Sequence, residues 1–353
     1  MTYRIAMEYH RFLPAAAAAI ITLAACADSP VAPITNSLSK TSNSPAFSRN
    51  GATHSYTFTI IDFPGAFQTV LSGINANGVI VGWYFQGTGC PAAIQTTCRV
   101  RGFTYADGVY TPVVYRDADG AEAWFTQLRG VGPSGEIVGD YRMTATESVV
   151  NLHGLRLTTL GNFVPVNYPG HTNTVAQRIL PDGTILGCYH DTDDMLTMYG
   201  MTTDKRRNNQ LPIAADGFSS LDMNTTMFLG GTPSGHRLTG FFTDMTTTPS
   251  KLRGFVLEGG TFAPFDVPSS SSTQGFDMAP SGIIVGLFRD AAAPHATHGF
   301  VRNGEEYTTI NFPGSTYTDV FGTNASGALV GKFRLAATGI AFHGYLATPQ
   351  TEE

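Results

Sequence analysis

A short glycine-bounded motif recurs six times along this 353-residue chain, and it restricts the fold more than any other feature of the sequence. The motif runs Gly-x-apolar-x-Gly, and the copy that begins at Gly235 is one residue longer. Its first glycines stand at positions 78, 135, 183, 235, 282 and 327, so successive copies are 57, 48, 52, 47 and 45 residues apart. A period of this length indicates an array of similar supersecondary units.

Two further markers follow the same period. A Gly-hydrophobe pair, usually after His or Arg, alternates with the first motif and begins at Gly102, Gly154, Gly200, Gly254, Gly299 and Gly344. An Asp/Asn-apolar-Pro marker, mostly completed by Gly, closes four units at residues 62–65, 167–170, 266–268 and 311–314. It is missing from the other two units, where residues 118–124 and 205–217 resemble insertions.

Each unit divides into four short strands and shows no helical period. A Pro/Asn/Gly turn precedes a continuously apolar strand, which indicates burial on both faces. Asn303-Gly304 and Asp107-Gly108 are typical hairpin turns between the third and fourth strands. Four strands in 45–57 residues match the blade of a β-propeller, whereas β-solenoid coils are shorter and tandem β-sandwich domains are longer.

The two ends of the chain predict how the array closes. Residues 56–63 form a spare strand, and the last unit, 316–347, lacks its fourth strand. We therefore predict an all-β, six-bladed β-propeller closed by pairing of the N-terminal strand with the last blade, which removes exposed strand edges. The predicted blades are 67–115, 122–167, 172–213, 217–266, 273–311, and 316–347 with 56–63.

The clearest repeat core, residues 297–316 continued through 322–331, resembles the HAF family of extracellular repeats, named for a His-small-Phe triplet. The resemblance covers roughly residues 56–347. It departs at Tyr199, Gly200 and Met201, which replace the triplet in a unit that also lacks the Pro-Gly. The resemblance implies secretion or a surface location, and it implies no known reaction.

The first 26 residues are typical of an export signal. An apolar run at 13–25 is too short to span a bilayer comfortably, and Met7 as the true start would leave a shorter leader and the same conclusion. Leu23-Ala24-Ala25-Cys26 resembles the lipobox of bacterial lipoproteins, which implies a lipid on Cys26; an ordinary signal peptide with a chance cysteine is the alternative. The residue after Cys26 is Ala27 and not Asp, which resembles the sorting signal of outer-membrane lipoproteins. We therefore expect a lipid anchor in the outer membrane or at the cell surface.

The predicted domains are thus 1–26 as lipoprotein signal peptide, 27–50 as a disordered tether rich in Ser, Pro, Asn and Thr, and 51–353 as the propeller. Only 14% of the residues are charged and the net charge is −6, which excludes electrostatic capture of nucleic acid. The 11% of aromatic residues excludes wholesale disorder. After residue 26 no apolar run reaches about 18 residues, which excludes a polytopic membrane protein.

Three cysteines remain after Cys26. Cys90 and Cys98 share one loop, and in an oxidising compartment we predict a local disulfide between them. Cys188 lies in an apolar strand and is predicted to be a small buried hydrophobe. Because His190 is two residues further along the same strand, an exposed Cys-His nucleophile is the alternative.

The loop face of the predicted ring carries the candidate ligand residues. Its acids are Asp191, Asp193, Asp194, Asp244 and Asp290, either as calcium ligands or, more simply, as solvated loop acids. The recurring histidines His153, His298 and His343 precede a third strand, and we predict a repeated structural hydrogen bond to the neighbouring blade. A metal site would instead need them to converge on the axis. We expect no metal and no cofactor.

No catalytic constellation can be identified from the sequence. The Ser-x-Asp-x-Gly-x-x-Trp box of sialidase propellers is absent, and the turn at 132–135 is a repeated hairpin rather than a Gly-x-Ser-x-Gly elbow. The prediction is a lipid-anchored extracytoplasmic propeller that acts as a binding or protein-interaction scaffold for a protein or glycan. The alternative is a periplasmic or cell-surface hydrolase or lyase acting on glycan or peptide, which inward carboxylates about 5–10 Å apart would favour.

Overall fold

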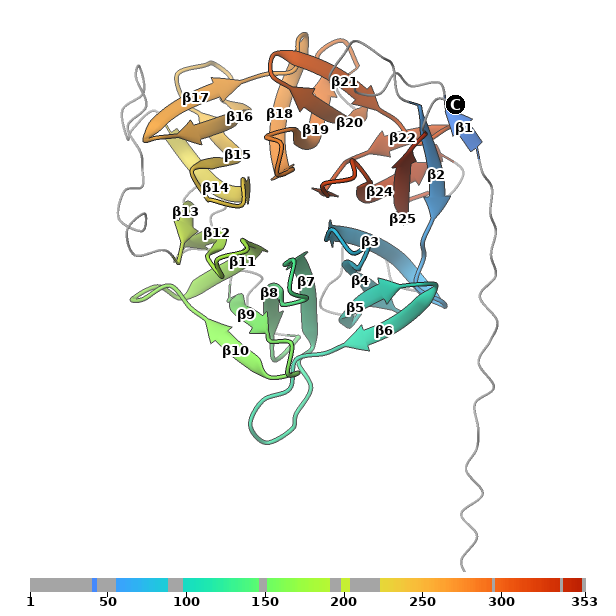
Figure 1. Ribbon diagram of the computed structural model, residues 1–353, viewed down its shortest axis with the longest axis vertical. Helices are drawn as coiled ribbons and strands as arrows, with labels where there is room; N and C mark the ends of the chain where they lie inside the picture. The colour runs from blue at the N-terminus through green and yellow to red at the C-terminus, as the bar shows by residue number, and fades with distance from the viewer. Residues whose placement is uncertain are drawn as a thin grey trace, which may run out of the picture. The chain divides into compact units, whose positions relative to one another are not determined.

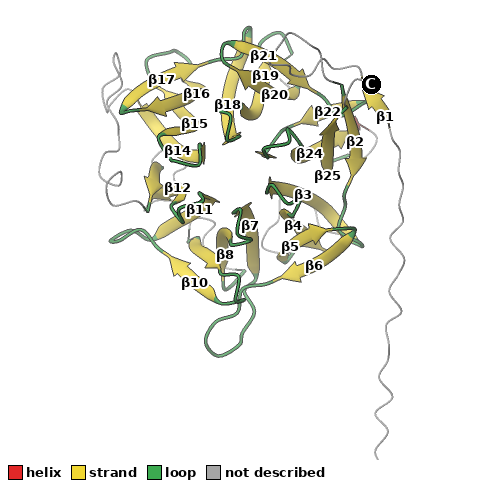
Figure 2. Ribbon diagram, in the orientation of Figure 1, coloured by secondary structure: helices red, strands yellow, loops and turns green. Residues whose placement is uncertain are grey.

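The computed structural model describes residues 40–42, 55–87, 98–145, 151–190, 198–203, 223–293, 296–336 and 339–350. All of them belong to one compact unit, Thr35–Glu353. Among these residues the named secondary-structure elements are all β-strands (Figure 2). The predicted all-β class is therefore confirmed.

Four groups of strands are complete antiparallel meanders, each with four consecutive strands. They are β3 (Ala66–Ile74), β4 (Ile80–Gln86), β5 (Val100–Ala106) and β6 (Val109–Val113); β7 (Phe125–Val131), β8 (Ile137–Arg142), β9 (His153–Leu157) and β10 (Phe163–Val166); β14 (Met223–Gly231), β15 (Arg237–Asp244), β16 (Lys251–Glu258) and β17 (Thr261–Phe265); and β18 (Ser270–Met278), β19 (Ile284–Asp290), β20 (Thr297–Asn303) and β21 (Glu306–Ile310).

A further group contains β11 (Asn173–Ile179), β12 (Ile185–His190) and β13 (Tyr199–Thr202). Its predicted fourth strand falls in 204–222, outside the described residues. The last group contains β22 (Ser315–Thr318) and β23 (Gly322–Thr323), which together form an interrupted inner strand, followed by β24 (Leu329–Leu335) and β25 (His343–Pro349). Figure 1 shows the groups side by side around a common centre, with β3, β7, β11, β14 and β18 nearest to it, which is the arrangement of a β-propeller.

The N-terminal strand joins the last group. β2 (Tyr56–Ile60) pairs antiparallel with β25, so that Tyr56 lies opposite Pro349 and Ile60 opposite Tyr345. The predicted pairing between the two ends of the folded unit is present. The short strand β1 (Lys40–Ser42), which lies within the predicted tether 27–50, pairs with the outer edge of β2. An unpaired strand edge offers backbone donors and acceptors that a neighbouring segment can satisfy.

The first sequence marker has a steric basis that is clear in the fifth repeat. Gly282 has a φ of +87°, which closes the hairpin between β18 and β19. Four residues later, a Cβ on Gly286 would lie 1.9 Å from the carbonyl oxygen of Gln274 on the inner strand. The motif therefore holds one glycine for its backbone conformation and one for the close approach of two strands.

Aromatic side chains that connect the groups, three of them in the third marker, stack on the following group. In the fifth repeat, Phe312 stacks on Phe333 of the following group, with ring centroids 3.5 Å apart and planes 8° apart. Its backbone N–H donates to the hydroxyl of Thr318 at 3.0 Å. The same stack joins Phe63 to Tyr84, Tyr115 to Tyr141, and Tyr168 to Tyr189. Such aromatic pairs contribute about 0.5–1.5 kcal/mol beyond their buried area.

Candidate functional site

The candidate site is a cavity of about 240 Å³ on the axis of the ring. Every group supplies lining residues from its innermost strand or, in the last group, from the link between β22 and β23: Val70, Ser72, Arg129, Val175, Gln177, Arg178, Met227, Leu229, Gln274, Phe276 and Phe321. Residues two apart in a strand share a face, so Met227 and Leu229, and likewise Gln274 and Phe276, both reach the cavity. The remaining lining comes from Trp83, Leu152, Cys188, His190, Met198 and Phe241.

The cavity has an apolar part and a polar part. Strands β14 and β18 and the β22–β23 link supply Met227, Leu229, Phe276 and Phe321, and the last two rings stack at 4.8 Å. Strands β3, β7 and β11 supply Ser72, Arg129 and Gln177. A mostly apolar wall with a few convergent polar groups is the usual composition of a small-molecule site.

Arg178 bars the axis at one end of this cavity. Its Nε lies 3.3 Å from Oδ1 of Asp277, and its Nη1 donates to the carbonyl oxygens of Arg129 at 2.7 Å and Gln177 at 2.8 Å. Its Nη2 donates to the carbonyl oxygen of Phe321. Arg178 also lines a second cavity, which Asp277 lines as well and which is bordered by the hairpin turns between first and second strands, so Arg178 lies between the two spaces.

The barrier occupies a position where the other groups carry glycine. An inner-strand register shift precedes Gly73, Gly130, Arg178, Gly230 and Asp277 at the same place in five groups. A Cβ on Gly130 would lie 2.6 Å from the carbonyl oxygen of Gln177, so the strands approach closely here. Burial raises the pKa of Asp277, while Arg178 and the N–H groups of Thr323 and Met278 oppose that rise.

A second buried ion pair supports the polar part. Nε of Arg129 lies 2.6 Å from Oδ1 of Asp140, and Nη2 of Arg129 donates to the side-chain oxygen of Gln127. Burial raises the pKa of the fully buried Asp140, and the guanidinium groups of Arg129 and Arg142 oppose that rise. One carboxylate therefore lies close to two arginines.

Cys188 lies in the cavity wall as a fully buried free thiol. Burial raises its pKa to about 12, so the thiol is protonated at neutral pH. Because the thiolate is the reactive form of cysteine, this environment disfavours the alternative of a Cys188–His190 nucleophile. The prediction that Cys188 is a buried apolar residue is confirmed.

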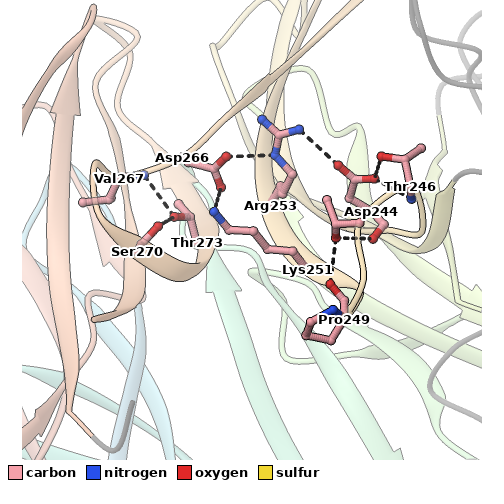
Figure 3. Close-up of polar contacts among 10 residues, drawn as sticks. Asp244, Thr246, Pro249, Lys251, Arg253, Asp266, Val267, Ser270 and Thr273 are labelled. Atoms are coloured by element: carbon pink, nitrogen blue, oxygen red, sulfur yellow. Dashed lines mark hydrogen bonds and ion pairs between the residues drawn. The ribbon is translucent and has the colours of Figure 1, made fainter. Parts of the chain in front are cut away.

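The structure places two of the predicted loop acids, Asp244 and Asp290, away from the cavity. Figure 3 shows Asp244 with Thr246 on one oxygen and Arg253 on the other. Burial alone would raise the pKa of Asp244, but these hydrogen bonds outweigh it and hold the pKa below the usual value. Asp290 accepts the N–H of Ala292 at 2.7 Å. Both carboxylates order their own loops, and Asp191, Asp193 and Asp194 lie outside the described residues.

His298 and His343 bond to the end of their own blade, so the predicted bond to the neighbouring blade is wrong for these two histidines. Nδ1 of His298 lies 2.7 Å from Oδ1 of Asn311, and Nδ1 of His343 lies 2.7 Å from Oδ2 of Asp62. His153 packs its ring on Tyr141, with centroids 5.2 Å apart. The reason is the strand register. β20 and β21 are antiparallel with Gly299 opposite Ile310, which brings His298 beside Asn311.

Arg253 takes the histidine position in the fourth repeat, where its Nε donates to Asp266 at 2.9 Å (Figure 3). In these three groups the position thus holds a cationic or imidazole donor that bonds to the Asp/Asn of the third marker. Among the described residues, no group of three or more His, Cys, Asp or Glu side chains is arranged to hold a metal ion.

The remaining predictions concern the cysteines and the leader. Cys98 is buried and disulfide-bonded, while Cys90 lies outside the described residues, so their pairing stays a prediction. Cys26 also lies outside them. In the part of the chain that the structure describes, no helix has the length and apolar character needed to cross a membrane.

Comparisons with known proteins place the chain by fold alone. No family model matches it, and no curated protein matches it. It is similar to a protein of unknown function from Dyadobacter fermentans, at 14% identity and a TM-score of 0.53 over 83% of this chain and 98% of that chain. It is also similar to a gluconolactonase from Xanthomonas campestris, at 13% identity and a TM-score of 0.48 over 88% of this chain and 95% of that chain.

A third similar structure is the β-propeller domain of the trilobed protease from Pyrococcus furiosus, at 8% identity and a TM-score of 0.47 over 81% of this chain and 98% of that chain. At such low identities a likeness says nothing about reaction or ligand.

The sequence does contain a signal for the inner strands. A threonine recurs near the start of each inner strand, at Thr69, Thr126, Thr174, Thr226, Thr273 and Thr318. Five of these hydroxyls accept the backbone N–H of an aromatic or apolar residue in the preceding connector. Counting one and three residues onward from this threonine leads to most of the inner-strand residues that line the cavity, and the fourth residue onward is glycine except at Arg178 and Asp277.

Proposed function

We propose that this chain is an exported, lipid-anchored six-bladed β-propeller of the HAF type that binds its ligand in the axial cavity and acts as a binding scaffold. Closure of the ring through β2 and β25 is part of the proposal. It is supported by the pairing of those strands and by the packing of Val330 in the last group with Leu71 and Ile80 in the first.

One observation carries the choice of binding over hydrolysis. None of the described residues that line the 240 Å³ cavity is Asp or Glu. The two carboxylates behind its wall and floor, Asp140 and Asp277, are each engaged by an arginine. Cleavage of a glycoside by paired carboxylates needs two that reach the scissile bond. Such a cavity suits ligand binding better than acid–base chemistry.

The proposal is tested with residues 27–353, which contain the whole described unit. Incubation with envelope extract, followed by native mass spectrometry, should detect a bound small molecule on the unmodified sequence. Leu229→Trp fills the cavity and should abolish binding of this molecule. Leu160→Trp, at a side chain that is 86% exposed, should leave the binding unchanged. Equal retention of the molecule by both variants, or turnover of envelope glycan by the unmodified protein, would overturn the proposal.

The lipid anchor has its own test. Cys26→Ser removes the thiol that the lipobox-like sequence Leu23-Ala24-Ala25-Cys26 would present for acylation. Because several acyl chains anchor far more firmly than one, the variant should leave the membrane fraction or fail to mature. Unchanged fractionation with an unchanged mature mass would contradict lipidation.

A further inference from the structure

We propose that the axial cavity takes a small aromatic or aliphatic monocarboxylate, with its acid group against Arg129 and Gln177 and its apolar body against Met227, Leu229 and Phe276. This inference rests on the proposed binding function and names the class of ligand. It follows from three properties of the cavity: an unused amide, a guanidinium nitrogen of Arg129 without a partner among the described residues, and a small apolar wall.

Gln177 provides the unused amide. Its side chain is only 8% exposed and lines the cavity, yet it makes no hydrogen bond to any described residue. Ser72, in the same wall, donates its hydroxyl to the carbonyl oxygens of Leu128 and of Val81, the latter at 3.2 Å. Buried polar groups in proteins are normally paired, so an unpaired amide facing a cavity indicates a partner supplied by a ligand.

Arg129 provides the charge. Its Nε and Nη2 are held by Asp140 and Gln127, which leaves Nη1 without a partner among the described residues. No described carboxylate lines the cavity to compete for Nη1. Hydrogen bonds between guanidinium and carboxylate are among the strongest in proteins, so an acid is the group that this wall selects.

The apolar wall sets the size and shape. The cavity volume of about 240 Å³ lies below the roughly 300–1,000 Å³ of sites for drug-sized ligands. The stacked rings of Phe276 and Phe321 present an aromatic surface, and Met227 beside them can adapt to an irregular shape. Arg178 closes one end through its bonds to Asp277 and backbone carbonyls, which limits the length of the ligand. A single ring or a short chain with one carboxylate satisfies these limits.

The experiment uses residues 27–353 and three probes of equal size: 3-phenylpropionate, 3-phenylpropanol and 3-phenylpropylammonium. Isothermal titration calorimetry should give a dissociation constant for the acid at least tenfold lower than for the alcohol, and no binding of the ammonium compound. Gln177→Leu should weaken the acid at least tenfold, and Gln177→Glu should abolish it through charge repulsion. Gln68→Leu is the matched control, because Gln68 is also buried and has an unpaired side-chain oxygen but does not line the cavity.

Melting temperatures of the three variants establish that each is folded before titration. If the alcohol binds as tightly as the acid, or if Gln177→Leu leaves the acid unaffected, the carboxylate class is overturned while binding in the cavity stands. If no probe binds, the class is again overturned, and the molecule retained from envelope extract decides the proposed function separately. If Gln68→Leu weakens the acid as much as Gln177→Leu, the assignment of Gln177 is overturned.

Discussion

Two connectors in this protein have the same local structure and different origins. The internal connector, residues 311–314, leads from β21 to β22, while the terminal connector, residues 62–65, leads from the N-terminal strand β2, which is paired in the last group, to β3 of the first group. Phe63 stacks on Tyr84 at 3.7 Å and donates its N–H to Thr69 at 2.9 Å, much as Phe312 does with Phe333 and Thr318.

The difference lies in how the third and fourth strands of each group are held together. β20 and β21 are joined by a hairpin turn, whereas β25 and β2 come from opposite ends of the folded unit, with 281 positions between His343 and Asp62. The terminal connector carries Asp62 where the internal one carries Asn311, and Asp62 also accepts the N–H of Gly344 at 3.0 Å. Where no turn joins the strands, the contact is charge-assisted and the same carboxylate accepts a second bond.

Removal of the N-terminal strand should have the largest effect on stability. Deletion of residues 51–65 should expose the edge of β25 and the apolar residues that now cover Phe58, which is 1% exposed. We expect loss of cooperative unfolding and aggregation, since an exposed strand edge pairs with other chains. Calorimetry and size-exclusion chromatography measure both effects. A deletion variant that stays monomeric with the parental melting temperature would show that the strand is dispensable.

Truncation of the stacked rings compares the two connectors directly. Phe312 is 4% exposed, so Phe312→Ala should cost about 3–5 kcal/mol of the free energy of unfolding. Phe63 is half-buried, so Phe63→Ala should cost less, while amide exchange in β2 should accelerate. Denaturant titration and hydrogen exchange give the two quantities. A larger loss for Phe63→Ala would mean that the terminal connector, and not the internal one, limits stability.

The charged contact predicts a small effect of pH. The hydrogen bond to Asp62 raises the pKa of His343 and outweighs the opposing effect of burial. The protonated imidazole is thus favoured in the folded state, so this contact adds stability fully below about pH 6.5, the ordinary histidine pKa, and loses it as pH rises through the folded value. The pair is partly exposed, so we expect about 1 kcal/mol or less.

Asp62→Asn gives the terminal connector the amide that the internal connector has at Asn311, and so tests whether the Asp62 carboxylate causes the pH dependence of stability. The free energy of unfolding of the unmodified protein, measured between pH 5 and 9, should exceed that of the variant most at the acid end. His298→Gln is the control, because its partner is the neutral Asn311. If the unmodified protein and Asp62→Asn show parallel pH curves, the ion pair contributes nothing to the joining of the two strands.

Several features of the fold follow from the sequence because their signals are local. The turn at Gly282 and the buried strand after it are encoded within a few residues, since backbone conformation and burial leave patterns of short range. Pairing of β2 with β25 was also predictable, although the strands are distant, because a spare strand at one end matched a missing strand at the other. The buried state of Cys188 followed in the same way from its apolar strand.

Only the tertiary structure decides the axial site. Arg178 and Asp277 stand 99 positions apart, in strands that otherwise match the repeat pattern, and nothing local predicts that their side chains meet. Asp244, by contrast, is a candidate ligand residue in the sequence, but in the structure its carboxylate is already engaged by Thr246 and Arg253. The reason is geometric: the cavity forms where inner strands from every group converge, so its chemistry depends on which side chains face the axis together, and periodicity along one strand carries no information about its partners across the ring.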